Sequence, residues 1–196
     1  MAEKDAMQKK IIAGLIVVLV LIVCVYMAVN SVSSDGSAEF KRGVALTEEH
    51  KFKEALAQYE KAAGKGNMQA AYRAGLYLTH GRKGVEKDIT KGMAYLKKAA
   101  ETGPSGAAYE LGIAYMDSLN GVKKDYKEGI KYIKMAAKKG HGTAMYLLGI
   151  YYDIGRGVEK DKDKAVEWLE EAAKKSTRSE IRTEAAARAS KIRSEQ

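Results

Sequence analysis

Cysteine is almost absent from this chain, since Cys24 is the only one in 196 residues. It lies inside an apolar run near the N-terminus, so the rest of the chain offers no thiol as a nucleophile or as a metal ligand. A domain without thiols is compatible with an oxidising compartment such as the periplasm. No Asn-x-Ser/Thr acceptor occurs either, which gives no support to a glycosylated lumenal domain.

Catalytic side chains are also scarce. The three histidines are His50, His80 and His141, and no carboxylate stands at metal-ligand spacing from them. The segments 81–84 and 155–157 contain glycines beside an arginine, but they lack the strand and helix context of a phosphate loop. No nucleophile, base and orienting group are recognisable together. We therefore predict a protein that is not an enzyme, with no cofactor, no metal and no small-molecule substrate.

One long apolar run is present, because residues 11–29 carry no charge and are rich in Ile, Leu and Val. At about 1.5 Å per residue, a helix of this length spans the roughly 30 Å hydrocarbon core. We predict a transmembrane helix at 11–29. A cleaved signal peptide fits less well, because the run is long and residues 28–30 form a poor cleavage site. A lipidation box ending at Cys24 is disfavoured by the bulky Val23 before it.

The flanking charges predict the orientation of this helix. Lys4, Lys9 and Lys10 lie in the short N-terminal segment 1–10, whereas the first basic residues on the other side begin at Lys41. The positive-inside rule places segment 1–10 in the cytoplasm and the rest of the chain outside it. The predicted location is the bacterial inner membrane, with a single span and a periplasmic domain.

The soluble part carries the positive charge of the chain. Residues 30–37 are polar and predict a flexible tether reaching about 15 Å from the membrane. From Ser37 onward there are 31 Lys and Arg against 22 Asp and Glu, which accounts for the net charge of +9. Lysines recur in pairs among acidic residues, which favours a solvated face over a nucleic-acid site, with attraction to anionic lipid as the alternative. The pairs are Lys97 and Lys98, Lys138 and Lys139, and Lys174 and Lys175.

A cassette of about 37 residues recurs three times, at 70–100, 107–137 and 144–173. Each copy opens with an alanine five residues before a glycine, has Gly-Val and then Asp in its middle, and ends near an Ala-Ala pair. A period in this range is typical of a solenoid of stacked helical hairpins. We expect an all-α, right-handed superhelical solenoid of about four helix-turn-helix repeats, with a C-terminal capping helix and one N-terminal transmembrane helix.

The recurrent positions have structural interpretations. In the middle copy, Ala107, Leu111, Gly112 and Tyr115 share one helical face, which we expect to be buried. Loop glycines permit the positive φ of a tight turn. An aspartate at the start of each second helix is expected to cap it rather than to act as a catalytic carboxylate; these are Asp88, Asp125 and Asp161. The second helices are expected to bury an aromatic residue, an aliphatic residue and the Ala pair; the aromatics are Tyr95, Tyr132 and Trp168.

The pattern A-x4-G-x2-Y, a glycine loop ending in G-V-x-x-D, and an aromatic residue shortly before an Ala pair resembles the Sel1-like repeat family, which is related to the tetratricopeptide repeats. The resemblance covers residues 70–176 and implies partner binding through the superhelix. Some positions depart from the pattern. Leu78 replaces the tyrosine in the first copy and Ser118 replaces a loop glycine in the second. Gly92 and Gly129 stand where alanine is usual, and each is expected to weaken a local contact.

Two segments flank the three repeats, which we place at 68–176. Residues 38–67 follow the same order of small and aromatic residues with a shorter loop, and predict an atypical first repeat. Residues 177–196 place Ile181, Ala185, Ala189 and Ile192 on one face. This pattern predicts a helix that caps the open end of the stack.

A second apolar row lies opposite the predicted buried face of the first helices, with tyrosines 37 residues apart. Such a row either packs between successive repeats or lines a groove in which tyrosine offers apolar area and a hydroxyl to a partner. Both interpretations remain open at this point. The partner-binding candidates are Tyr72, Leu76, Tyr77, Tyr109, Ile113, Met116, Tyr146, Ile150 and Tyr151.

The sequence thus predicts a non-catalytic, membrane-anchored adaptor or assembly subunit that binds protein partners, and no nucleic acid, within a bacterial cell-envelope complex. One alternative is an accessory subunit whose transmembrane helix docks on a polytopic membrane protein and regulates it. Another is a receptor for an envelope polymer such as peptidoglycan, with exposed tyrosines as stacking platforms.

Overall fold

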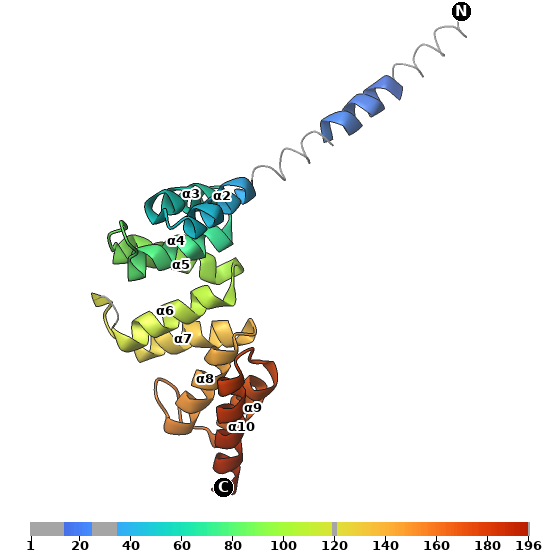
Figure 1. The fold of residues 1–196 in the computed structure, drawn as a ribbon. Coiled ribbons are helices and arrows are strands. Elements are labelled where there is room, and N and C mark those ends of the chain that lie inside the picture. The colour runs from blue at the N-terminus through green and yellow to red at the C-terminus, as the bar shows by residue number, and fades with distance from the viewer. Residues whose placement is uncertain (1–13, 25–34, 119–120, 196) are drawn as a thin grey trace, which may run out of the picture.

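The computed structural model describes residues 14–24, 35–118 and 121–195. From Ser37 onward, its described residues form helices that pack in consecutive pairs along an elongated stack (Figure 1). The pairs are α2 (Ser37–Glu48) with α3 (Phe52–Gly64), α4 (Met68–His80) with α5 (Ile89–Thr102), α6 (Ser105–Asp117) with α7 (Tyr126–Lys138), and α8 (Gly142–Ile154) with α9 (Lys162–Lys175), followed by α10 (Ser179–Ser194). The described ranges contain no strand, only an isolated bridge between Arg82 and Val85. The prediction of an all-α stack of hairpins is confirmed.

Glycine allows close contact between the two helices of a pair. A Cβ on Gly112 of α6 would lie 2.6 Å from Cδ1 of Ile133 and 3.1 Å from the carbonyl oxygen of Gly129 on α7. A Cβ on Gly129 would lie 2.6 Å from Cγ of Met116 and 3.0 Å from the carbonyl oxygen of Gly112. The two backbones therefore approach each other where neither carries a side chain. The expectation that Gly129 weakens this contact is wrong, because larger residues from the opposite helix fill the space above each glycine.

The predicted aspartate caps are confirmed. The carboxylate of Asp88 accepts a hydrogen bond from the backbone N–H of Lys91 at 2.9 Å, and that of Asp125 accepts one from Glu128 at 3.0 Å. Asp161 does the same for Lys164 at 2.9 Å. Each cap satisfies one of the backbone donors that the first turn of a helix leaves without an intrahelical partner.

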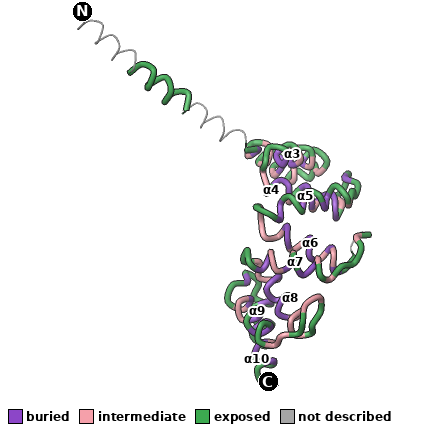
Figure 2. The backbone as a smooth tube through the Cα atoms, turned by 180° about the vertical axis from the view of Figure 1, so that it is seen from behind, coloured by how far each residue is buried: buried purple, intermediate pink, exposed green. Residues whose placement is uncertain are grey.

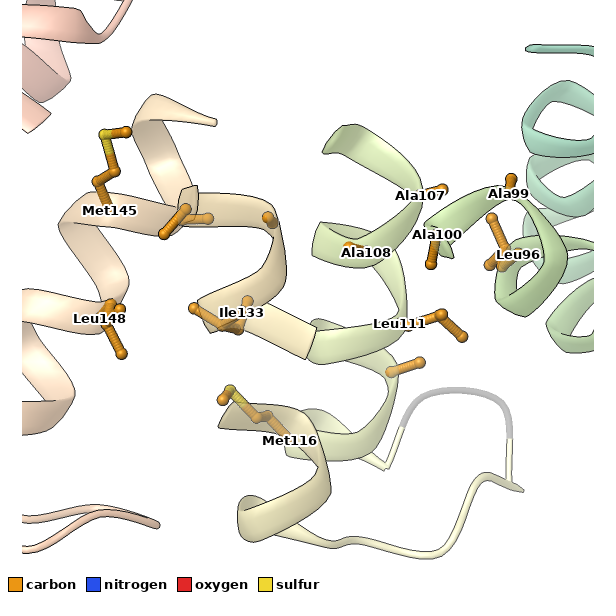
Figure 3. Close-up of a cluster of buried hydrophobic side chains, with 14 of the residues drawn as sticks. Leu96, Ala99, Ala100, Ala107, Ala108, Leu111, Met116, Ile133, Met145 and Leu148 are labelled. Carbon is orange, nitrogen blue, oxygen red and sulfur yellow. The ribbon is translucent and has the colours of Figure 1, made fainter. Parts of the chain in front are cut away.

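The core is continuous along the stack, as the buried positions in Figure 2 show. In the second helices, the aliphatic residue of each copy is at most 1% exposed; these residues are Leu96, Ile133 and Leu169. Figure 3 shows Leu111 of α6 pointing toward α5, where Leu96 and Ala99 lie, so this side chain joins two neighbouring pairs. The aromatics Tyr95, Tyr132 and Trp168 are only half-buried and pack against this core from outside, so the expectation that the second helices bury them is wrong.

One lysine from each of two predicted lysine pairs caps the preceding second helix. Lys98 Nζ donates to the carbonyl oxygen of Ala63, at the end of α3, at 2.9 Å. Lys139 Nζ donates to the carbonyl oxygens of Ala100 at 2.6 Å and Glu101 at 2.9 Å, at the end of α5. A cation at the negative end of the helix dipole is stabilising. The solvated-face interpretation therefore does not describe these two lysines, which link successive repeats.

Helix α10 packs on α9 and α8 at the end of the stack. Its buried residues are Ile181, Ala185, Ala189 and Ile192. The hydroxyl of Tyr146 on α8 donates a hydrogen bond to the carboxylate of Glu184 on α10. The helix therefore covers apolar surface of the last repeat.

The N-terminal part of the chain is described only in one stretch. Residues 14–24 are helical, and their apolar side chains are exposed, Leu19 by 65%. Among the residues that the structure describes, no helix is long and apolar enough to cross a membrane. The remaining residues of the predicted 11–29 span, the segment 1–10 and most of the 30–37 tether lie outside the described residues.

Candidate partner-binding surface

Three of the predicted partner-binding residues are buried. Met116 is 1% exposed, Tyr77 is 3% exposed and Tyr146 is 7% exposed. The Tyr77 hydroxyl shares a hydrogen bond with the hydroxyl of Thr47 on α2 at 2.8 Å, and Tyr146 bonds the carboxylate of Glu184. These three side chains hold neighbouring helices together, and they offer a partner almost no surface.

The other six candidates are half-buried and lie on the first helices of three successive pairs. We call them the tyrosine–aliphatic surface: Tyr72 and Leu76 of α4, Tyr109 and Ile113 of α6, and Ile150 and Tyr151 of α8. Burial raises the pKa of Tyr109 and of Tyr151, and Asp117 adds to both shifts. Tyr109 also adds to the shift in the pKa of Tyr151, so these two tyrosines of successive repeats lie near each other.

The tyrosines of this surface also contact the next repeat. A Cβ on Gly106, at the start of α6, would lie 2.7 Å from the hydroxyl oxygen of Tyr72. The hydroxyl of Tyr72 therefore packs against the first turn of α6. The ring of Tyr109 stacks on the imidazole of His141, just before α8, with 4.5 Å between ring centroids and 17° between planes. Each ring thus contributes to packing between repeats and keeps a part of its surface exposed. The two interpretations of the tyrosine row do not exclude each other.

Glu110 is a functional candidate that the sequence analysis missed. Burial raises the pKa of its carboxyl above the usual range, and the nearby His80 opposes this effect, with 3.8 Å between His80 Nε2 and Glu110 Oε2. Burial raises the pKa of both Tyr72 and Tyr109, and Glu110 adds to both shifts. The acidic group therefore lies close to two tyrosines of the surface and gives it a hydrogen-bond acceptor.

A sequence signal for Glu110 existed. The residue directly after the row tyrosine is Arg73, Glu110 and Leu147 in the three copies, while the residues around it recur. A position that varies inside an otherwise regular repeat does not have to make the packing contact that the recurrent positions make in every copy. Such positions are where a solenoid can acquire specificity.

His141 caps α8 through a neutral imidazole. Its Nδ1 accepts a hydrogen bond from the backbone N–H of Ala144 at 3.2 Å. Burial lowers the pKa of His141, which favours the neutral form that can accept. Asn67 holds the equivalent position before α4 and accepts from Ala70 at 2.9 Å.

We expect acid to destabilise the fold through His141. Because its pKa is lower in the folded than in the unfolded protein, its contribution is complete above the ordinary value of 6.5 and is lost as the pH falls below it. Urea titrations from about pH 8 to about pH 5 should show a smaller loss of unfolding free energy for His141→Asn than for wild type. Equal losses would show that other groups cause the acid sensitivity.

The described residues hold no group of three or more His, Cys, Asp or Glu that could bind a metal ion. The tyrosine–aliphatic surface offers hydroxyls, one carboxylate and apolar area. This arrangement can recognise a partner through contact and hydrogen bonds.

The repeats match a known family. The model of the Sel1 repeat fits residues 69–104, 105–141 and 142–176, which together make up more than half of the chain. The chain belongs to the Sel1 repeat family. Proteins with these repeats mediate protein-protein interaction and are typically non-catalytic. No curated protein sequence matches the chain.

Solved Sel1-type structures resemble this one. A Sel1 repeat protein from Oxalobacter formigenes is 28% identical, with a TM-score of 0.65, over 73% of this chain and 60% of that one. The protective antigen c5321 of uropathogenic Escherichia coli is 29% identical, with a TM-score of 0.64, over 72% of this chain and 31% of that one. Helicobacter pylori cysteine rich protein B is 26% identical, with a TM-score of 0.52, over 66% of this chain and 90% of that one. The chain thus spans less than two thirds of the first two proteins.

Proposed function

We propose that this Sel1 repeat protein is a non-catalytic adaptor or assembly subunit that binds a protein partner within a complex of the bacterial cell envelope. The observation that carries the proposal is the tyrosine–aliphatic surface, which places half-exposed side chains on the first helices of three successive repeats. Tyrosine is enriched where binding energy concentrates, because one ring provides a large contact area and a hydroxyl at low entropic cost.

The chemistry of the surface supports a protein partner. Ile113 and Ile150 provide apolar area, and Tyr72 and Tyr109 provide hydroxyls beside the carboxylate of Glu110. A partner segment with apolar side chains and backbone N–H groups would satisfy both kinds of group. Specific contact of this kind needs several repeats together, which is how solenoids bind extended ligands.

We further propose that the protein is anchored in the inner membrane by residues 11–29, with its N-terminus in the cytoplasm and its repeats in the periplasm. The support is the uncharged length of this run and the three lysines before it. The apolar side chains of residues 14–24 are exposed, and a hydrocarbon environment would cover them. This anchor would hold the repeats beside membrane complexes.

The partner-binding proposal predicts a strong effect of Tyr109→Ala. The full chain, purified in mild detergent, should co-purify with a stoichiometric partner protein. The amount of partner that co-purifies with the variant should be at least about ten-fold lower, because a central aromatic contact disappears. Circular dichroism should show unchanged helical content. Tyr95→Ala is the matched control, since Tyr95 is also half-buried but lies on the second helix α5.

Three outcomes would contradict this proposal. Loss of helical content in Tyr109→Ala would assign the tyrosine to the interior. Equal loss of partner in Tyr95→Ala would place binding elsewhere. Retention of peptidoglycan without any stoichiometric protein would favour the polymer receptor instead.

The topology has its own test. A reporter that is active only outside the cytoplasm, fused after Gln196, should be active in the proposed orientation, because the positive charges keep the N-terminus inside. A reporter active only in the cytoplasm should be silent at the same fusion point. The opposite pattern would overturn the proposed location without affecting the partner-binding proposal.

A further inference from the structure

A concave region that shares no lining residue with the tyrosine–aliphatic surface lies between α7 and the loop that joins α8 to α9. It is a groove of about 480 Å³. Its apolar lining comes from Ile130 and Met135 of α7 and from Val158 of the loop. Gly157 brings the loop onto the first turn of α7, since a Cβ there would lie 2.8 Å from the carbonyl oxygen of Tyr126. The groove is therefore fixed by backbone contact.

Four lysines of α7 line the same groove: Lys127, Lys131, Lys134 and Lys138. Their spacing of four, three and four residues places them on one side of the helix. Lys131 pairs with Glu128 at 2.9 Å. Within the described part of the chain, Lys127, Lys134 and Lys138 form no ion pair, and Lys134 lies over the ring of Tyr152 at 5.2 Å. The groove therefore carries positive charge that the chain itself leaves largely uncompensated.

The region continues past Lys134 and Val158 into a neighbouring hollow of about 420 Å³. Lys160 and Lys164 line this extension together with Tyr152. Two acidic residues, Glu159 and Asp161, also line the extension. Asp161 is already engaged, because it caps α9 and pairs with Lys164 at 2.5 Å. The two hollows share Lys134 and Val158, and each is far larger than a single ion needs.

We propose that this groove binds an acidic segment of a partner protein, with carboxylates placed on the lysines of α7 and an aliphatic side chain seated on the half-buried Met135 and Val158. Like charges aligned on one helix repel each other, and carboxylates of a partner would relieve this repulsion. A recessed aliphatic floor between the lysines suits a side chain that enters it. The flat surface of a membrane would reach the lysines but would leave the floor unfilled.

The test uses the full chain in mild detergent, immobilised and exposed to a random-sequence peptide library. We expect selected peptides to be rich in Asp and Glu around an aliphatic residue, and binding to weaken as salt screens the charges. The double variant Lys134→Glu/Lys138→Glu should reduce binding of the selected peptides at least about ten-fold. Met135→Ser should reduce it as well, because the floor loses apolar area.

The control is Lys83→Glu/Lys174→Glu, which makes the same change in net charge at exposed lysines outside the groove. It should bind the selected peptides like wild type. Selection of peptides without acidic enrichment, or equal loss in both double variants, would overturn the proposal. Binding of vesicles containing phosphatidylglycerol that depends on Lys134 and Lys138, without acidic peptide binding, would assign the lysines to a lipid surface. Because Tyr109 lies outside this groove, failure here leaves the partner-binding test of the proposed function unaffected.

Discussion

Replacing Gly112 with valine is expected to lower the unfolding free energy by about 3 kcal/mol or more. The new Cβ would lie 2.6 Å from Cδ1 and 2.7 Å from Cγ1 of Ile133, which is fully buried. It would also lie 3.1 Å from the carbonyl oxygen of Gly129, which belongs to the backbone of α7. The two helices must therefore separate, and the contacts around them are lost.

Urea unfolding followed by circular dichroism and by the fluorescence of Trp168, the only tryptophan, measures this effect. Gly64→Val is the matched control, because a Cβ on Gly64, at the end of α3, meets nothing within 4 Å. Its effect should stay within about 0.5 kcal/mol. If Gly112→Val were as stable as Gly64→Val, α6 and α7 would not be in close contact at this glycine.

Leu111→Ala is expected to cost about 3 to 4 kcal/mol, in the range of buried leucine truncations. Leu111 is fully buried, and it points from α6 toward Leu96 of α5 (Figure 3). The cavity would therefore open between two repeats rather than inside one. Because each repeat of a solenoid is stabilised by its neighbours, the loss should weaken the coupling between the two halves of the stack.

Circular dichroism and Trp168 fluorescence should therefore give separate unfolding transitions in Leu111→Ala. The tryptophan reports on α9, on the C-terminal side of the new cavity. Ile154→Ala removes a similar aliphatic side chain that is 47% exposed, and it should cost less than about 1 kcal/mol. Equal effects of the two substitutions would show that Leu111 does not join the repeats.

Much of the fold could be predicted because each recurrent residue has a local role. Asp88, Asp125 and Asp161 cap helices through hydrogen bonds to backbone three residues away, so spacing alone identifies them. The role of Gly129 depends on the helix opposite, and its sequence position suggested a defect where the structure has a close contact. Lys139 binds carbonyl oxygens of the preceding repeat, a partner that no local pattern indicates.

The candidate site was predictable only in part. Periodicity placed Tyr72, Tyr109 and Tyr146 in one row. It could not show which of them are buried, because the burial of each tyrosine depends on the next helix in the stack. Tyr72 and Tyr109 precede another repeat and stay half-exposed, whereas Tyr146 is covered by α10 and bonded to Glu184. Glu110 follows Tyr109 directly in the sequence, and it belongs to the surface because folding also brings it near His80 and Tyr72 of the preceding repeat.

The sequence by itself determined the repeat length, the helical hairpins, their caps and the family, because these depend on spacing within a few tens of residues. Only the tertiary structure decided which side chains remain accessible, since accessibility is a property of the packed neighbours. In the folded protein, Tyr77 and Met116 are buried, Tyr109 is half-buried, and α7 contacts the loop that joins α8 to α9. The lysine-lined groove exists only through that last contact, because neither element forms it alone.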